Sequence, residues 1–86
     1  MKINKLIEVV KEKITKNIVL QKIDVEDKSF LHKSHKNNSP NKFHIKIIIT
    51  SDELKSKKKI ESSQRIYKIL ENELKNYIHS IQLSIN

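Results

Sequence analysis

The spacing of apolar residues changes along this chain, and that change limits the folds open to it more than any other feature. Isoleucine, leucine and valine recur every three or four residues near the start and again over residues 60–75. Over residues 18–27, 43–51 and 78–85, apolar and polar residues alternate instead. A period near 3.6 is typical of a helix with one buried face, and a period of two is typical of a strand. The predicted order is therefore helix, strand, strand, short helix, helix, strand.

The first helix is predicted over residues 2–16. Its apolar stripe has helical spacing and consists of Ile3, Leu6, Ile7, Val10 and Ile14. Asn17 follows, and in a chain without glycine we expect it to end the helix in the left-handed conformation. The strand over residues 18–27 is predicted to bury Val19, Ile23 and Val25 on one face.

The strongest predicted strand is residues 43–51, because its β-branched run suits a central position in a sheet. Ser51 is a plausible N-cap for a short helical turn that begins at Asp52. The helix over residues 60–75 is expected to end at Asn76, as the first helix does at Asn17. In the last strand, we place His79 on the same face as Ile81, Leu83 and Ile85.

A strand, a helix and a second strand in succession predict a parallel strand pair, because the helix carries the chain back to the starting edge. The first two strands, joined by a loop, are expected to be antiparallel. The predicted fold is thus a single α+β domain over residues 1–86. It has the order αββααβ and a three-stranded mixed sheet with helices packed on one face.

Two residue types that many functional sites need do not occur in these 86 residues. Without cysteine, the chain has no thiolate zinc site, no nucleophilic thiol and no iron–sulfur cluster held by its own cysteines. Without glycine, it lacks the phosphate-binding loops of nucleotide-binding folds. No apolar run approaches the roughly 20 residues of a membrane span. We predict that the protein is not an enzyme and does not bind membranes.

The formal net charge of +8 comes from 17 lysines and a single arginine. Arginine is the usual choice for reading phosphates and bases, so most of this charge is interpreted as solvated surface. The cluster Lys55, Lys57, Lys58 and Lys59 has two functional interpretations. It could contact nucleic-acid phosphates, or it could steer an acidic partner towards the protein.

Several short segments, in the right order, resemble the BolA family over nearly the whole chain. Residues 27–32 (Asp-Lys-Ser-Phe-Leu-His) resemble the family's Asp-Glu-Ser-x-x-His. Residues 43–51 resemble its Ser-His-Phe-x-Val-x-Val-Val-Ser strand, and residues 78–81 (Ile-His-Ser-Ile) its Val-His-Ala-Leu strand. The resemblance implies a class II KH-like fold, which agrees with the predicted order of elements.

The resemblance also implies a function. BolA-like proteins bind monothiol glutaredoxins, and the pair can share a [2Fe–2S] cluster for which glutaredoxin and glutathione supply thiolates. The family's contribution to ligation is a loop residue and a histidine assigned to the last helix. His32 fits the loop ligand, and His35 is a weaker alternative. The helix position falls on Ser63, so the histidine there is lost, and we expect Ser63→His to stabilise a shared cluster.

The same comparison leaves an alternative open. A KH-like nucleic-acid-binding transcriptional regulator would use the lysine cluster with Gln64 and Arg65, but a KH domain needs a Gly-x-x-Gly loop that this chain lacks. Only weak, salt-sensitive DNA or RNA binding is therefore expected. His44 and His79 are interpreted as structural. We expect a monomer when free and a cytoplasmic location, with mitochondria as the alternative.

Overall fold

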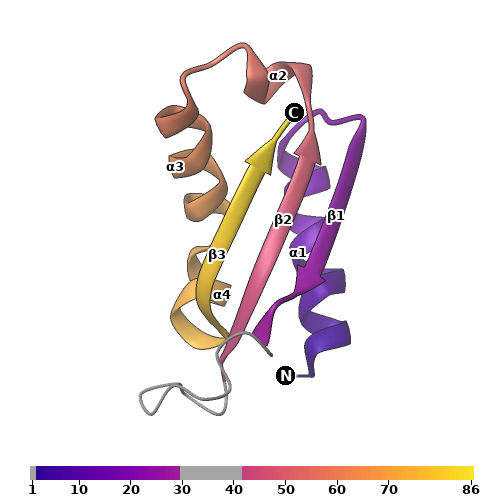
Figure 1. Cartoon of the computed structure of the whole chain (residues 1–86), viewed down its shortest axis with the longest axis vertical. Coiled ribbons are helices and arrows are strands. Elements are labelled where there is room, and N and C mark those ends of the chain that lie inside the picture. The colour runs from indigo at the N-terminus through magenta and orange to yellow at the C-terminus, as the bar shows by residue number, and fades with distance from the viewer. Residues whose placement is uncertain (1, 30–41) are drawn as a thin grey trace.

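The computed structural model describes residues 2–29 and 42–86. It contains helices α1 (Ile3–Asn17), α2 (Asp52–Lys55), α3 (Lys59–Ile69) and α4 (Glu71–Asn76), and strands β1 (Lys22–Asp27), β2 (Phe43–Thr50) and β3 (Ile78–Ile85). The sheet order is β1-β2-β3, with β1 antiparallel and β3 parallel to β2. The predicted α+β class, mixed sheet and strand directions are confirmed (Figure 1).

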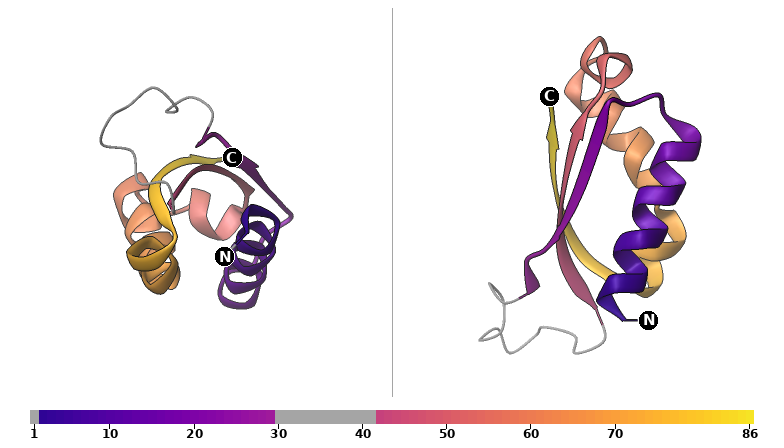
Figure 2. Two further views of the ribbon diagram at one scale, coloured as in Figure 1. Left: turned by 90° about the horizontal axis from the view of Figure 1, so that it is seen from below. Right: turned by 90° about the vertical axis from the view of Figure 1, so that its right-hand side faces the viewer.

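The helices lie on one face of the sheet and leave the other face open (Figure 2). Alternation along β2 accounts for this arrangement, because Ile45, Ile47 and Ile49 are buried together against the helices. The apolar stripe of α1 supplies the other side of the core through Leu6, Val10 and Ile14. Ile66, Leu70 and Ile78 complete the core from the opposite half of the chain.

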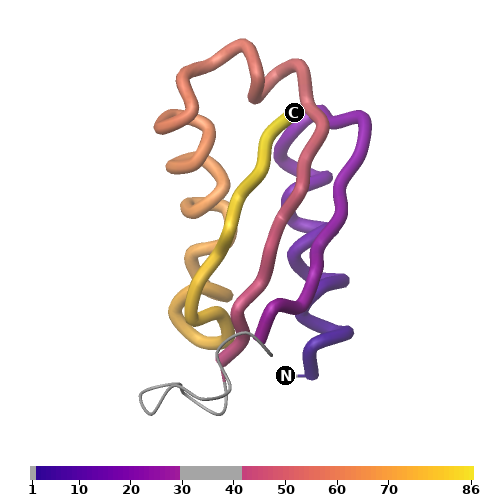
Figure 3. The backbone as a smooth tube through the Cα atoms, in the orientation of Figure 1, coloured from indigo at the N-terminus to yellow at the C-terminus, as the bar shows by residue number. Residues whose placement is uncertain are grey.

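β2 and β3 are joined by a long connection that runs over α2 and returns along α3 and α4 (Figure 3). Ser51 begins this connection as predicted, since its Oγ accepts a hydrogen bond from the Leu54 backbone N–H. The predicted helix over residues 60–75 is instead two helices. Leu70 lies between them with φ −97° and ψ 16°, and its side chain is fully buried.

The predicted strand over residues 18–27 begins four residues late. Val19 was placed on the buried face with Ile23 and Val25, but its side chain is 73% exposed. Ile18 is buried instead, because α1 ends beside it and its backbone N–H donates to the Ile14 carbonyl. The helical hydrogen bond therefore outweighs the local alternation at this junction.

The left-handed helix ends predicted at both asparagines are also wrong. Within residues 2–29 and 42–86, no residue has a positive φ. Each asparagine instead donates from its own side-chain amide to the carbonyl four residues earlier: Asn17 to Lys13 at 2.6 Å and Asn76 to Asn72 at 2.9 Å. Each side-chain amide thus adds a second donor to a carbonyl in the last turn of its helix.

Candidate functional site

The two ends of the sheet carry different chemistry. One end, where β2 and β3 begin, holds His44, His79 and Ser80, and we call it the histidine site. The opposite end, where β2 and β3 finish, holds the exposed lysine cluster Lys55, Lys57, Lys58 and Lys59. Eight residues of β2 at a rise of about 3.3 Å each separate the two ends by about 25 Å.

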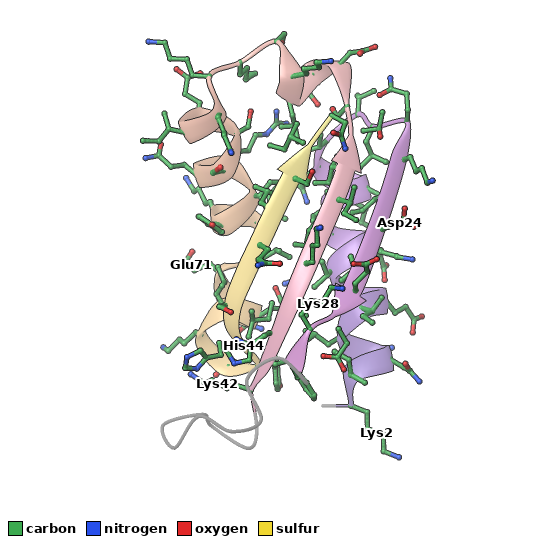
Figure 4. The ribbon with its side chains drawn as sticks, viewed as in Figure 1. Lys2, Asp24, Lys28, Lys42, His44 and Glu71 are labelled. Carbon is green, nitrogen blue, oxygen red and sulfur yellow. The ribbon has the colours of Figure 1, made fainter. Side chains whose placement is uncertain are left out.

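His44 forms the fixed part of the histidine site. Its ring is 4% exposed, and its Nδ1 lies 2.6 Å from the Oγ of Ser80 on the neighbouring strand. Its backbone is fixed as well, because its N–H donates to Ser29 Oγ at 3.1 Å and its carbonyl accepts from the Lys28 N–H at 2.7 Å. The structural role predicted for His44 agrees with these contacts, which place its ring at the lower end of the sheet (Figure 4).

His79 forms the accessible part of the same site. The pairing of β2 with β3 is irregular between Phe43 and His44, so that Ile78 pairs with Phe43 while Ser80 pairs with His44. His79 is exposed, and its ring centroid lies 4.7 Å from that of His44. The prediction that His79 shares the core-facing side of Ile81 and Leu83 is therefore wrong, and its imidazole is available to a ligand outside the protein.

The candidate ligands His32 and His35 lie outside the described residues. Their segment begins after Ser29 and ends before Lys42, and both of these residues lie at the His79 end of the sheet (Figure 4). The described residues on either side of this segment therefore lie near the histidine site. Within residues 2–29 and 42–86, no group of three or more histidine, aspartate or glutamate side chains could hold a metal ion.

Ser63, the position assigned to the lost histidine, lies towards the opposite end of the molecule. Its neighbour Ser62 is fully buried and donates from Oγ to the carbonyl of Leu54, which follows the end of β2. Position 63 is therefore separated from the histidine site by most of the length of the sheet. Ser62, and not the half-buried Ser63, is the serine that packs in this buried contact.

Gln64 is exposed, but Arg65 is engaged in contacts within the protein. Its Nη2 donates to the Asn17 carbonyl at 2.8 Å, and its Nη1 lies 3.2 Å from Glu53 Oε1. The hydrogen bond from the Val19 backbone N–H to Glu53, followed by that from Arg65, lowers the pKa of the Glu53 carboxyl. This network joins α1, α2 and α3, so it positions the lysine cluster rather than extending it.

His79 is the functional candidate that the sequence argument missed. The signal was present in residues 78–81, whose histidine is shared with the family strand that they resemble. It was overlooked because the alternation of β3 predicted a buried side chain, and an irregular pairing between strands is not visible in one sequence. The described helices include none that is long and apolar enough to span a membrane.

Comparisons with known proteins agree with the fold. The family described as BolA-like protein matches residues 14–86. A DNA-binding transcriptional regulator BolA from Haemophilus influenzae is 31% identical over 78 residues, which cover 91% of this chain and 73% of that protein. The BolA domain of SufE1 from Arabidopsis thaliana superposes with a TM-score of 0.82 at 25% identity, covering 99% of this chain and 94% of that one. BolA1 from Arabidopsis thaliana gives a TM-score of 0.78 at 20% identity, covering 93% and 88%.

Proposed function

Because this chain belongs to the BolA family, we propose that it acts as a non-enzymatic partner of a monothiol glutaredoxin. In this proposal it contributes a histidine ligand to a [2Fe–2S] cluster that the thiolates of glutaredoxin and glutathione hold. The role would be cluster assembly, cluster trafficking or iron-dependent regulation. The observation that carries the proposal is the exposed imidazole of His79, which lies beside the fixed ring of His44.

The donor set of the chain is compatible with sharing a cluster but not with holding one alone. There is no cysteine, so every thiolate must come from elsewhere. Imidazole is an established substitute for thiolate on one iron of a [2Fe–2S] cluster, where it raises the reduction potential. His79 provides such a nitrogen at an accessible position, and the contacts of His44 with Ser80 and Ser29 hold the neighbouring backbone in place.

The proposal assigns the second imidazole to His79 rather than to position 63. A ligand at position 63 would lie most of the length of the sheet away from Ser29 and His44. His79 avoids this difficulty, because it lies at the end where the segment of residues 30–41 is attached. We therefore replace the expectation that Ser63→His stabilises the cluster with the expectation that it has no effect.

Titration with a cluster-loaded monothiol glutaredoxin tests the proposal. We expect the wild-type protein to change the visible absorption and circular dichroism of the cluster, and the His79→Ala variant to lose that change. Ser63→His and Gln82→Ala are matched controls on α3 and β3, and both should behave as wild type. Unchanged spectra with the wild-type protein would refute the partnership, and a full response from His79→Ala would refute the ligand assignment.

DNA binding is a second candidate function, favoured by the four exposed lysines and by the similarity to the DNA-binding transcriptional regulator of Haemophilus influenzae. Lysine contacts to phosphates release counterions, so their affinity falls steeply as the salt concentration rises. Binding of a labelled 20-base-pair duplex at about 50 mM and about 200 mM salt separates the two outcomes. Retained, sequence-dependent binding at the higher concentration would support a regulator, and complete loss would reduce the interaction to non-specific charge.

A further inference from the structure

The two edges of the sheet are protected very differently. β1 is one edge, and four of its six residues are charged: Lys22, Asp24, Glu26 and Asp27. β3 is the other edge, and its eight residues include no lysine, arginine, aspartate, glutamate or proline. Soluble proteins usually guard an edge strand with charges or proline, because its free N–H and carbonyl groups can pair with another chain. β3 lacks this protection.

The outward-facing groups of β3 can be identified from its pairing with β2. Asn86, directly after β3, donates its N–H to the Ile49 carbonyl and accepts at its own carbonyl from the Ser51 N–H. The backbone N–H and carbonyl of Asn86 therefore both face β2. Because successive residues of a strand point these groups to alternate sides, the N–H and carbonyl groups of Ile81, Leu83 and Ile85 face outward. These outward groups lie on the free side of β3, which is an edge strand and pairs with β2 alone among the described strands.

A pocket lies where this edge meets the lysine cluster. Its volume is about 280 Å³. The lining residues are Leu83, Ser84 and Ile85 from β3 and Leu54, Lys55, Lys57, Lys59 and Ser62 from the α2–α3 region. Three of these residues are lysines and none is acidic, while leucine and isoleucine side chains provide the apolar part. The lining is thus complementary to a carboxylate-bearing chain with apolar neighbours.

We propose that the outer edge of β3 accepts an extended segment of an acidic partner protein as a fourth strand, with acidic residues of that segment in the lysine-lined pocket. Main-chain hydrogen bonds to Ile81, Leu83 and Ile85 would hold the segment, as in other cases of strand addition. The lysines would select the acidic segment and fix which of its ends reaches the pocket.

A second copy of this chain fits the edge less well. Its own β3 has no carboxylate to place in the pocket, and each copy carries a net charge of +8. The lysine-lined pocket is also separate from the histidine site, because Ile85 lies six residues, or about 20 Å, along β3 from His79. The cluster proposal and the edge proposal can therefore fail independently.

Amide chemical shifts of the isotope-labelled full chain provide the test. The probes are the peptide Thr-Val-Thr-Val-Thr-Glu-Asp-Asp, the same residues in reverse order, and a version of each with lysine in place of every acidic residue. One of the acidic peptides should shift the amides of Ile81, Leu83 and Ile85 together with those of the lysine cluster. The lysine versions should bind at least about tenfold more weakly, and added salt should lower the affinity for the acidic peptide.

Variants separate charge from strand pairing. The triple change Lys55→Gln, Lys57→Gln and Lys59→Gln should raise the Kd for the acidic peptide at least about tenfold. The matched triple Lys2→Gln, Lys11→Gln and Lys75→Gln removes the same charge elsewhere and should have a much smaller effect. Ile85→Pro removes an outward N–H that would donate to the bound segment, so this change should also weaken binding. The fold should tolerate it, because proline is accepted on an edge strand where the N–H faces out of the sheet.

Three results would overturn the edge proposal. The first is the absence of shifts at the β3 amides with both acidic peptides. The second is binding of single-stranded DNA, but of neither acidic peptide, at the same residues. The third is self-association of the free protein through β3 in sedimentation equilibrium. The His79→Ala variant should bind the acidic peptide as wild type does, which keeps this result apart from the outcome at the histidine site.

Discussion

The ion pair between Lys13 on α1 and Glu73 on α4 provides the sharpest stability prediction. Lys13 Nζ lies 2.9 Å from Oε1 and 2.7 Å from Oε2 of Glu73, across 60 residues of sequence. Glu73 is 2% exposed, whereas the Lys13 side chain is 39% exposed. Replacing Lys13 by methionine keeps much of the aliphatic stem but leaves a buried carboxylate without its cation.

The magnitude follows from the unequal burial of the two groups. Removing one partner of a fully buried pair costs about 3–5 kcal/mol, and exposed pairs contribute about 0–1 kcal/mol. Because water reaches Lys13 but barely reaches Glu73, we expect Lys13→Met to lower the free energy of unfolding by about 2 kcal/mol at pH 7. For a domain of this size, that loss lowers Tm by about 8–16 °C.

The pH dependence tests the cause of that loss. Burial acts to raise the pKa of the Glu73 carboxyl, but the hydrogen bonds from Lys13 and Asn72 outweigh it, so the pKa lies below its usual value of 4.5. A pKa that is lower in the folded state stabilises the protein above about pH 4.5, and this stabilisation is lost as the pH falls through the folded pKa. In Lys13→Met, burial acts without the cation, and the Glu73 pKa should rise.

The difference in Tm between wild type and Lys13→Met should therefore shrink as the pH falls from 7 to 4. Thermal unfolding followed by circular dichroism at several pH values measures it. Lys16→Met is the matched control, because Lys16 pairs with Glu12 on the solvent side of the same helix, and its Tm should stay close to that of wild type. A constant difference across this pH range, or an equal loss in Lys16→Met, would refute the reasoning.

Three further changes test other parts of the fold by the same unfolding measurement. Ser62→Ala should cost about 1 kcal/mol because the hydrogen bond from the buried Ser62 hydroxyl to the Leu54 carbonyl is lost, while Ser63→Ala should have little effect. Val25→Thr places a hydroxyl in the core and should cost about 1–2 kcal/mol, whereas Val19→Thr should be neutral, and equal losses would contradict the observed exposure of Val19. Arg65→Gln should lower Tm by breaking the contacts of Arg65 to Asn17 and Glu53. An unchanged Tm would mean that these two contacts do not contribute to stability.

The periodic parts of the sequence predicted their structure well. Side chains that recur with a period of 3.6 or two share one face of a helix or strand, so the stripe of α1 and the alternation of β2 identified their buried faces directly. The order of elements then restricted the sheet to one antiparallel and one parallel pair. The motif resemblance to the BolA family added the expected partner and a class of metal chemistry, because those depend on residue identity rather than on packing.

The placement of the functional candidates depended on contacts between distant segments. Whether His79 faces the core or the solvent is decided by the irregular pairing of β3 with Phe43 and His44. The end of the sheet that holds Ser63 is likewise decided by the contact of Ser62 with Leu54. The apolar pattern of one sequence contains neither pairing, since it records which side chains avoid water and not which strand lies beside them.

The sequence by itself determined which regions are helical and which are extended, the main buried faces and the absence of any thiolate, because each of these follows from local spacing or composition. Only the tertiary structure decided which histidine is accessible, which arginine is engaged within the protein, and which edge of the sheet is unguarded. The physical reason is that exposure and pairing are properties of surfaces assembled from segments far apart in the chain, and those surfaces exist only after the segments pack together.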